Sequence, residues 1–353
     1  MSRFWSRDIA ELNPYTPGEQ PQMDGLVKLN TNENPYGPSP LAIEAIKRAA
    51  DDNLRKYPDP SAAALKQAVA NHHALNTDQV FVGNSSDEVL AHVFKALLRH
   101  EQALLMPDIS YSFYPVWCEY FGIDFRSVPL REDFSLAVED YSGANGGIIF
   151  ANPNAPTGMA ISNQQIAHLL NQHPDSVVVV DEAYADFSGQ SAVSLINKHA
   201  NLLVVQTLSK ARSLAGLRVG LALGQAHLIE GLERVKNSFH PYPLDRLAIA
   251  GAVAAYQDQA WFDSTIEKVV ATRETAVTQL NQMGFEVLPS AANFVMVRHG
   301  SAAAADLFSK LREHKIVVRY FSAPRLDQWL RISIGSDAEM AALFEALEEI
   351  LTA

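Results

Sequence analysis

Short apolar runs alternate with amphipathic helical patterns between about residues 40 and 225. The apolar runs lie at residues 80–82, 103–106, 147–150, 177–180, 202–205 and 219–222. Residues 41–51, 61–71 and 86–99 have the spacing of helices, and further helical patterns separate most of the later runs. Strands that are apolar on both sides and separated by helices predict an α/β fold, in which helices cover both faces of a mainly parallel sheet.

The pattern changes after Pro243. A long helical stretch covers residues 244–282, with a break expected near 257–260, and strand-like runs follow at 285–288, 293–297, 316–319 and 329–334. Further helices are expected at 302–313 and from Asp337 onward. Residues 1–30 are rich in proline, glycine and polar side chains, which indicates an extended arm. We therefore expect an N-terminal arm (1–30), a large domain (31–245) and a smaller α+β C-terminal domain (246–353).

Composition argues against several classes of protein. The 353 residues carry a formal net charge of −12, whereas a general nucleic-acid binder needs a basic face. Cys118 is the one cysteine, so neither an intrachain disulfide nor a thiolate metal cluster is expected. The histidines lack the HxH and HExxH spacings, so no metal site is expected. Without a signal-peptide pattern or an apolar run of the ~18 residues that span a membrane, the chain is expected to be soluble and cytoplasmic.

Two polar segments follow neighbouring apolar runs of the expected sheet. TLSKARSLAGLR (207–218) follows the run at 202–205, and DEAY (181–184) follows the run at 177–180. They place Lys210, Asp181, Tyr184 and Arg218 at the ends of adjacent strands. Pyridoxal 5′-phosphate (PLP) chemistry needs such a set, because a lysine amine holds its aldehyde as a Schiff base and a carboxylate keeps its pyridine nitrogen protonated.

Each of these side chains also has a simpler explanation. A lone lysine is usually a solvated surface charge, a carboxylate at a strand end often caps the next element, and a tyrosine often packs in the core. Lys210 in TLSK, with Arg218 eight residues later, is a far less common arrangement. We therefore assign Lys210 to the Schiff base, from which its freed amine moves the proton between the substrate Cα and the cofactor.

A third polar segment, GNSSDE (83–88), lies between an apolar run and an amphipathic helix. Ser85, Ser86 or Asp87 can cap that helix, and its free amides and positive dipole end form an anion site. Capping alone is the simpler explanation, but beside a PLP lysine the segment favours phosphate binding. Tyr111 follows the run at 103–106 and is a candidate to stack on the pyridine ring, while Tyr114 is expected in the core.

Taken together, these segments resemble the fold type I PLP-dependent aminotransferases, and among them the histidinol-phosphate type. Residues 207–220 fit the family pattern T-x-S-K-A-x-x-L-A-G-x-R-x-G at every specified position. Further matching segments are LNPY (12–15), LNTNE (29–33), RKYPD (55–59), DEAY (181–184), PYPL (241–244) and LRI (330–332). The resemblance implies a seven-stranded, mainly parallel sheet in the large domain, a homodimer, and PLP as cofactor.

The resemblance also implies a role for each matching residue. Lys210 would form the Schiff base, Asp181 would pair with the pyridinium, Tyr184 would bond the phenolic oxygen and Tyr111 would stack on the ring. The cofactor phosphate would be held by Ser86, Asp87, Ser209 and Arg218, and by Tyr57 from the neighbouring subunit. The anionic ends of the substrates would be bound by Tyr15, Arg319 and Arg331.

One position departs from the family pattern. In ANPNAPTG (151–158), Ala155 replaces the asparagine that usually bonds the phenolic oxygen of the cofactor. That oxygen would then depend on Tyr184 alone, or on Asn154 or Asn152 if the loop shifts. The two X–Pro bonds of the same segment favour a cis peptide.

The reaction implied by the resemblance interconverts histidinol phosphate and 2-oxoglutarate with imidazole acetol phosphate and glutamate, in histidine biosynthesis. An aromatic amino-acid aminotransferase is the main alternative, because it would share the same core residues. A PLP decarboxylase of a phosphorylated amino acid, or a noncatalytic PLP-fold protein that binds a partner or DNA, is less favoured.

Overall fold

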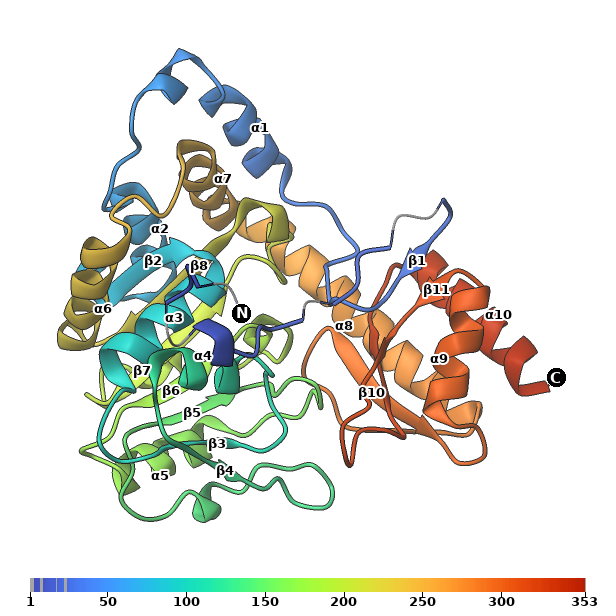
Figure 1. Ribbon diagram of the computed structural model, residues 1–353. Helices are drawn as coiled ribbons and strands as arrows, with labels where there is room; N and C mark the ends of the chain where they lie inside the picture. The colour runs from blue at the N-terminus through green and yellow to red at the C-terminus, as the bar shows by residue number, and fades with distance from the viewer. Residues whose placement is uncertain (1–2, 7–8, 17, 22–23, 353) are drawn as a thin grey trace.

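The computed structural model describes residues 3–6, 9–16, 18–21 and 24–352 (Figure 1). Its largest sheet has seven strands in the order β2-β8-β7-β6-β5-β3-β4, which confirms the expected size. Strands β4, β3, β5, β6 and β7 are parallel, and β8 runs antiparallel to β7 and β2. The strands are β2 (Val80–Asn84), β3 (Leu104–Pro107), β4 (Phe125–Val128), β5 (Ile148–Ala151), β6 (Val178–Asp181), β7 (Leu202–Thr207) and β8 (Val219–Gly224).

Helices cover both faces of this sheet, as the apolar runs predicted. Side chains alternate along each strand, so that Val80 and Val82 enter one core and Phe81 enters the other. The first core is closed by α1 (Pro40–Ala49), α2 (Ala63–His73), α5 (Asn163–Gln172) and α7 (Arg246–Gln257). The second is closed by α3 (Ser85–Leu97), α4 (Tyr114–Phe121) and α6 (Ala226–Phe239).

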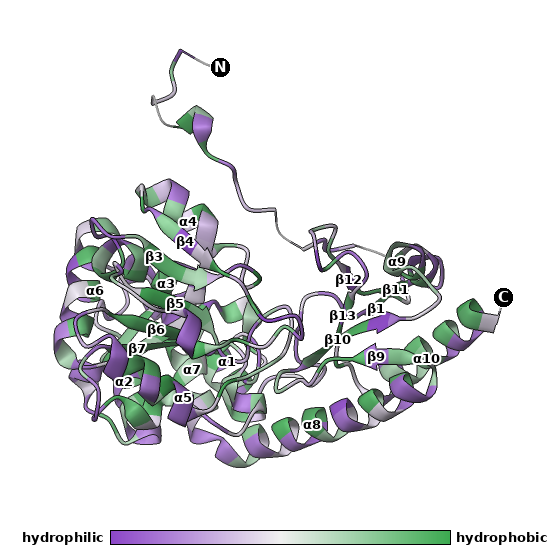
Figure 2. Cartoon of the chain, turned by 90° about the horizontal axis from the view of Figure 1, so that it is seen from below, coloured by the Kyte–Doolittle hydropathy of each residue, from purple (hydrophilic) through white to green (hydrophobic). Residues whose placement is uncertain are grey.

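The C-terminal part of the chain forms a smaller sheet with its own core. This sheet is antiparallel, in the order β12-β13-β10-β9, and the long helix α8 leads to it from the large sheet (Figures 1 and 2). Its strands are β9 (Phe285–Val287), β10 (Phe294–His299), β12 (Arg319–Tyr320) and β13 (Leu330–Ser333). Its helices are α8 (Gln259–Gln282), α9 (Ala304–Glu313) and α10 (Asp337–Thr352). The expected α+β character of this region is confirmed.

The break expected near residues 257–260 falls at Asp258, which lies between α7 and α8. Helix α7 contributes to the core of the large sheet, whereas α8 packs in the core of the small one. The chain therefore passes from the core of the large sheet to the core of the small sheet at this break. The domain boundary at residue 245 stays a prediction. Helix α7 follows that boundary in the sequence, yet it packs in the core of the large sheet.

The N-terminal segment is more structured than an arm. Within the described residues it holds a short 3-10 helix at Ile9–Glu11 and strand β1 (Val27–Lys28), which pairs in parallel with β11 (Ile316–Val317). The arm prediction missed β1, because its partner comes from the opposite end of the sequence. This pairing holds residues 29–34 between the large sheet and the small one.

The Asn152–Pro153 and Ala155–Pro156 peptide bonds are both cis, as the sequence led us to expect. None of the helices in the described ranges is long and apolar enough to cross a membrane. The same residues contain no group of three or more His, Cys, Asp or Glu side chains that could hold a metal ion.

Candidate active site

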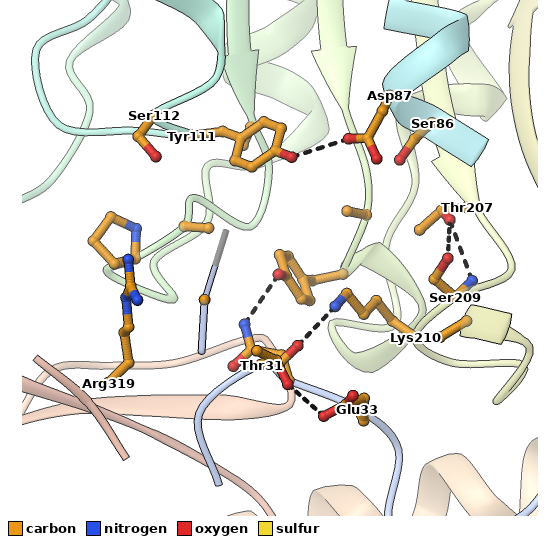
Figure 3. Close-up of a pocket in the computed structure, with 18 of the residues that line it drawn as sticks. Thr31, Glu33, Ser86, Asp87, Tyr111, Ser112, Thr207, Ser209, Lys210 and Arg319 are labelled. Carbon is orange, nitrogen blue, oxygen red and sulfur yellow. Dashed lines mark hydrogen bonds between the residues drawn. The ribbon is translucent and has the colours of Figure 1, made fainter. Parts of the chain in front are cut away.

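A pocket of about 420 Å³ opens at the ends of β5, β6 and β7 and is closed on the other side by residues 30–33, β12 and β13 (Figure 3). It brings together most of the residues that the sequence singled out. Those that line it are Tyr15, Ser86, Asp87, Tyr111, Asp181, Tyr184, Ser209, Lys210, Arg218, Arg319 and Arg331. Asn154 and Tyr57 are not part of this lining.

Lys210 follows the end of β7, and its amine crosses the pocket. Its Nζ donates a hydrogen bond to the backbone oxygen of Thr31 at 2.9 Å and lies 5.9 Å from the centre of the Tyr184 ring (Figure 3). The loop before it is held locally, since Thr207 Oγ1 accepts from the Ser209 amide at 3.2 Å and donates to Ser209 Oγ at 2.9 Å. The lysine amine is therefore presented to the pocket rather than to bulk water.

Asp181 ends β6 and is 5 % exposed. Its Oδ2 accepts from Tyr114 Oη at 2.7 Å, and its Oδ1 accepts from the backbone amide of Ala183 at 3.2 Å. Burial raises the pKa of Asp181 to about 6, although these two bonds act in the opposite direction. A buried carboxylate of this kind is stabilised in its ionised form by a cationic donor, such as a protonated pyridine nitrogen.

Tyr114 shows that a core residue can also serve the site. It is fully buried, as the sequence led us to expect, yet its hydroxyl is bonded to Asp181. A buried phenol needs a hydrogen-bond partner. The apolar pattern indicated its burial but gave no sign of the direction of its hydroxyl.

The first turn of α3 faces the pocket through Ser86 and Asp87. Its N-cap, Asn84, makes no side-chain hydrogen bond to that turn among the described residues. The Ser85 amide donates to Arg218 O at 2.9 Å, so it is the amides after Ser85, together with the helix dipole, that favour an anion here. Gly220 permits the close approach of β8, because a Cβ at this position would lie 2.2 Å from the backbone of Ser85.

Arg218 lies beside this turn and forms an ion pair with Asp87, with Nη2 and Oδ2 3.1 Å apart. The other carboxylate oxygen of Asp87 accepts from Tyr111 Oη at 3.0 Å (Figure 3). Burial is the main cause that raises the pKa of Tyr111, and the Asp87 charge adds to it. Ser85 Oγ also donates to Asp87 Oδ2 at 3.4 Å. The Asp87 carboxylate is thus already hydrogen-bonded within the protein, which leaves backbone amides, Ser86, Ser209 and Arg218 as the groups available to a phosphate.

Two arginines enter the pocket from the small sheet. Arg319 in β12 and Arg331 in β13 are paired across the two strands. Arg331 Nη2 donates to the backbone oxygen of Asn30 at 2.8 Å, while its buried Nε has no partner among the described residues. Burial lowers the pKa of Arg331. An anionic ligand would satisfy the open donors of Arg331, and its carboxylate or phosphate would suit the planar guanidinium.

Comparison with known proteins agrees with this geometry. A family model described as aminotransferase class I and II matches residues 24–347. The chain belongs to this family. The histidinol-phosphate aminotransferase of Pseudomonas putida (strain W619) is 60 % identical, covering 98 % of this chain and 100 % of the relative. Histidinol-phosphate aminotransferase 2 of Dechloromonas aromatica (strain RCB) is 56 % identical, covering 99 % of each chain.

Solved aminotransferase structures have the same fold. The histidinol-phosphate aminotransferase of Sinorhizobium meliloti, determined in complex with PLP, superimposes with a TM-score of 0.84 at 26 % identity, over 92 % of this chain and 90 % of that one. The enzyme of that name from Clostridium acetobutylicum gives a TM-score of 0.86 at 22 % identity, over 93 % and 99 %. The fold class and the resemblance noted in the sequence are confirmed.

Asn154, predicted to bind the cofactor, and Asn152, offered as an alternative if the loop shifts, are both directed elsewhere in this aminotransferase. The Asn154 side chain accepts from Ser110 Oγ at 2.8 Å and donates to Ile109 O at 3.0 Å, so it braces the loop after β3. The Asn152 side chain bonds both backbone groups of Ile161. Ala155 itself lines the pocket. Neither asparagine therefore replaces the amide that is missing at position 155 in this structure.

Tyr57 is 81 % exposed and stacks on Tyr242, with ring centroids 4.9 Å apart. Within one chain of the aminotransferase it does not contribute to the pocket. Conversely, Thr31, Asn32 and Glu33 line the pocket although no site role was assigned to them from the sequence. The one indication of their role in the sequence is that the LNTNE segment, which contains them, matches the family pattern.

Proposed function

We propose that this protein is a PLP-dependent transaminase that interconverts histidinol phosphate and 2-oxoglutarate with imidazole acetol phosphate and glutamate. The observation that carries the proposal is the convergence of the Lys210 amine, the buried Asp181 carboxylate and two arginines in one pocket. Relatives that are 56–60 % identical over at least 98 % of this chain bear the name histidinol-phosphate aminotransferase and support the choice of substrate. We also propose a cytoplasmic location.

The residues present fit PLP. Asp181 is a buried acid that lacks a cationic partner among the described residues, and the first turn of α3 offers unpaired amides beside Arg218 and Ser209. These groups suit a pyridine nitrogen and a phosphate respectively. When bound, PLP supplies an aldehyde that amines condense with and a ring that accepts electron density from the substrate Cα.

The protein contributes proton transfer and charge stabilisation. The Lys210 amine, whose Nζ is bonded to Thr31 O across the pocket, would take the proton from the substrate Cα and return it at the cofactor carbon. Asp181 would hold the protonated pyridine nitrogen as a carboxylate, and Tyr114 Oη donates to its Oδ2. Tyr184 would donate to the phenolic oxygen of the cofactor. These groups are fixed before the substrate arrives, so they cost little reorganisation during the reaction.

Arg319 and Arg331 give the pocket its preference for anions. Histidinol phosphate brings a phosphate and glutamate brings a side-chain carboxylate, so one arginine pair can bind both substrates in turn. Tyr15 borders the same space, with its ring packed on Phe113 at a centroid distance of 4.6 Å. Phenylalanine would bring only its α-carboxylate to this positive end, whereas histidinol phosphate brings a phosphate with more charge and more acceptor oxygens, which favours histidinol phosphate over the aromatic alternative.

We further propose a homodimer in which Tyr57 reaches the phosphate site of the partner subunit. Its exposure and its place on the surface beside Tyr242 support this arrangement. Mixing subunits of Tyr57→Ala with subunits of the inactive Lys210→Ala should restore PLP affinity and activity at one site per mixed dimer. Mixed dimers that gain nothing over Tyr57→Ala alone would contradict a shared site.

A panel of amino donors tests the proposed reaction. With 2-oxoglutarate as acceptor, kcat/KM for histidinol phosphate should exceed that for phenylalanine by at least about a hundredfold, because a phosphate makes more charged hydrogen bonds to the arginine pair than a single carboxylate does. Equal or reversed values would favour the aromatic aminotransferase. Release of CO2 without any 2-oxo acid would favour the decarboxylase instead.

A further inference from the structure

On the side of the loop that carries Ala155, the pocket surface around Tyr184 is apolar and has no side-chain amide directed at the Tyr184 hydroxyl. Ala155, Ala292 and Phe294 form a small apolar cluster against the Tyr184 ring. The Tyr184 and Phe294 rings pack edge to face, with their centroids 5.0 Å apart. Asn152 and Asn154 are occupied by loop contacts, as described above. The loop that carries Ala155 therefore offers no side-chain amide to help Tyr184.

The Tyr184 hydroxyl instead accepts a hydrogen bond from Asn32, on the side of the pocket formed by residues 30–33. Asn32 Nδ2 donates to Tyr184 Oη at 3.0 Å. Asn32 is 1 % exposed and precedes Glu33 in the segment between the two sheets. Because the amide nitrogen can only donate, Tyr184 Oη must accept, and its own hydrogen remains available to another acceptor in the pocket.

The orientation of the Asn32 amide is fixed by a second set of bonds. The Asn32 backbone amide donates to Ser333 Oγ at 2.9 Å, so the Ser333 hydroxyl hydrogen is free to donate to Asn32 Oδ1, 2.8 Å away. With Oδ1 occupied by a donor, Nδ2 must face Tyr184. The bonds thus run in one direction, from the Asn32 backbone through Ser333 and the Asn32 side chain to Tyr184.

The backbone of Asn32 is held as firmly as its side chain. Its φ is +57°, in the left-handed region that asparagine and aspartate tolerate better than most residues. Its carbonyl oxygen accepts from Asn293 Nδ2 at 3.0 Å, and both Asn293 and Ser333 are buried. The small sheet therefore sets the position of an amide that contacts Tyr184 in the large domain.

We propose that Asn32 is a positioning residue for Tyr184, which it forces to donate its hydroxyl hydrogen to the phenolic oxygen of the cofactor, in place of the asparagine that Ala155 replaces. The inference rests on the PLP function proposed above. It assigns to Ser333 the task of keeping the Asn32 amide in the donating orientation. The electronic state of the cofactor thereby depends on how residues 30–33 and β13 dock.

The substitution Asn32→Asp tests this assignment with little change of shape or backbone preference. A carboxylate oxygen in place of Nδ2 would accept the Tyr184 hydrogen instead of leaving it for the cofactor. Loss of a donor destabilises the anionic phenolic oxygen, so the apparent pKa of the Lys210-bound chromophore should rise by about one unit in a pH titration of visible absorbance. Tyr184→Phe should give a comparable rise, and adding Asn32→Asp to it should have no further effect.

Asn34→Asp is the matched control, since it adds the same charge two residues away. Asn34 Nδ2 bonds Ala211 O at 3.2 Å, Asn34 Oδ1 accepts from the Tyr36 amide, and Asn34 does not line the pocket. The chromophore pKa of the Asn34→Asp variant should lie within about 0.3 units of the wild-type value. This difference is well below the change expected from one charged hydrogen bond. An equal rise in both variants, or no rise in Asn32→Asp, would overturn the proposal.

Ser333→Ala gives an independent answer without adding charge, and it decides the matter if Asn32→Asp does not fold. Freed from its orienting hydroxyl, the Asn32 amide can rotate, and the chromophore pKa should shift in the same direction by a smaller amount. An unchanged chromophore pKa in a folded, PLP-loaded Ser333→Ala protein would contradict the proposal that Ser333 orients the Asn32 amide. A wild-type protein that forms no chromophore with PLP would instead reject the proposed function.

Discussion

The two walls of the pocket are built in different ways. The strand-end wall consists of the loops after β6 and β7 and carries Asp181 and Lys210 on short, locally bonded segments. The docking wall consists of residues 30–33 with β12 and β13, and it is held by contacts such as Asn32 with Ser333 and Arg331 with Asn30. In the proposed function the first wall would supply the reactive groups, whereas the second would bind anions and orient Tyr184 and Lys210.

The groups proposed to act on the reacting atoms and the groups proposed to bind the substrate therefore lie on different walls. Groups that act on the reacting atoms lie on the sheet, where neighbouring strands fix them. Arg319 and Arg331, the groups proposed to hold the substrate, lie on a wall that depends on the packing of the small sheet. Changes in the strand-end wall should therefore lower kcat, while changes in the docking wall should mainly raise KM.

The largest effect is expected from Asp181→Asn. An amide of the same shape cannot stabilise a protonated pyridine nitrogen, so kcat should fall by about a thousandfold. Glu182→Gln is the control, because Glu182 is also a buried acid, with its pKa raised to about 7 by burial, but bonds Ser191 and Ala192 outside the pocket. If both variants lose kcat to the same degree, the assignment of charge stabilisation to the strand-end wall is wrong.

A change in the docking wall should act on binding instead. Arg331→Lys replaces a planar fork by a point charge, and KM for both glutamate and histidinol phosphate should rise by about 30-fold. Arg298→Lys is the matched change at an exposed arginine of the same sheet, paired with Glu286, and should leave KM unaltered. A fall in kcat at constant KM in Arg331→Lys would remove the distinction between the two walls.

Tyr114→Phe should have a smaller effect that depends on pH. The Tyr114 bond lowers the pKa of Asp181, which burial has raised to about 6, so its loss moves that pKa further upward. More Asp181 is then protonated near pH 7, and PLP affinity there should fall by about tenfold, as expected for one charged hydrogen bond, and recover at higher pH. Binding titrations across pH 5–9 that superimpose for the two proteins would show that Tyr114 does not tune Asp181.

The sequence predicted the strand-end wall because its residues are local in the chain. An apolar run followed by DEAY or TLSK places Asp181, Tyr184 and Lys210 at strand ends whatever the rest of the fold does. The mainly parallel sheet followed from the same runs. Asn154 shows the limit of this reasoning, because its side chain turns toward Ser110 and Ile109 of another loop, and no local pattern encodes that choice.

The docking wall could not be derived from local patterns, and its arginines were assigned by family resemblance. The bond between Asn32 and Ser333 joins opposite ends of the sequence, as does the pairing of β1 with β11 close to it. The left-handed backbone of Asn32 is likewise set by this docking. Tertiary packing decides such contacts, and hydrophobic periodicity carries no information about them.

Reduction of the PLP-loaded protein with borohydride, followed by peptide mapping, tests the central claim most directly. We expect a single pyridoxyl label, on the peptide that contains Lys210, because among the described lysines that amine alone lines the pocket beside Asp181. A label on another lysine, or none above the level of surface modification, would contradict it.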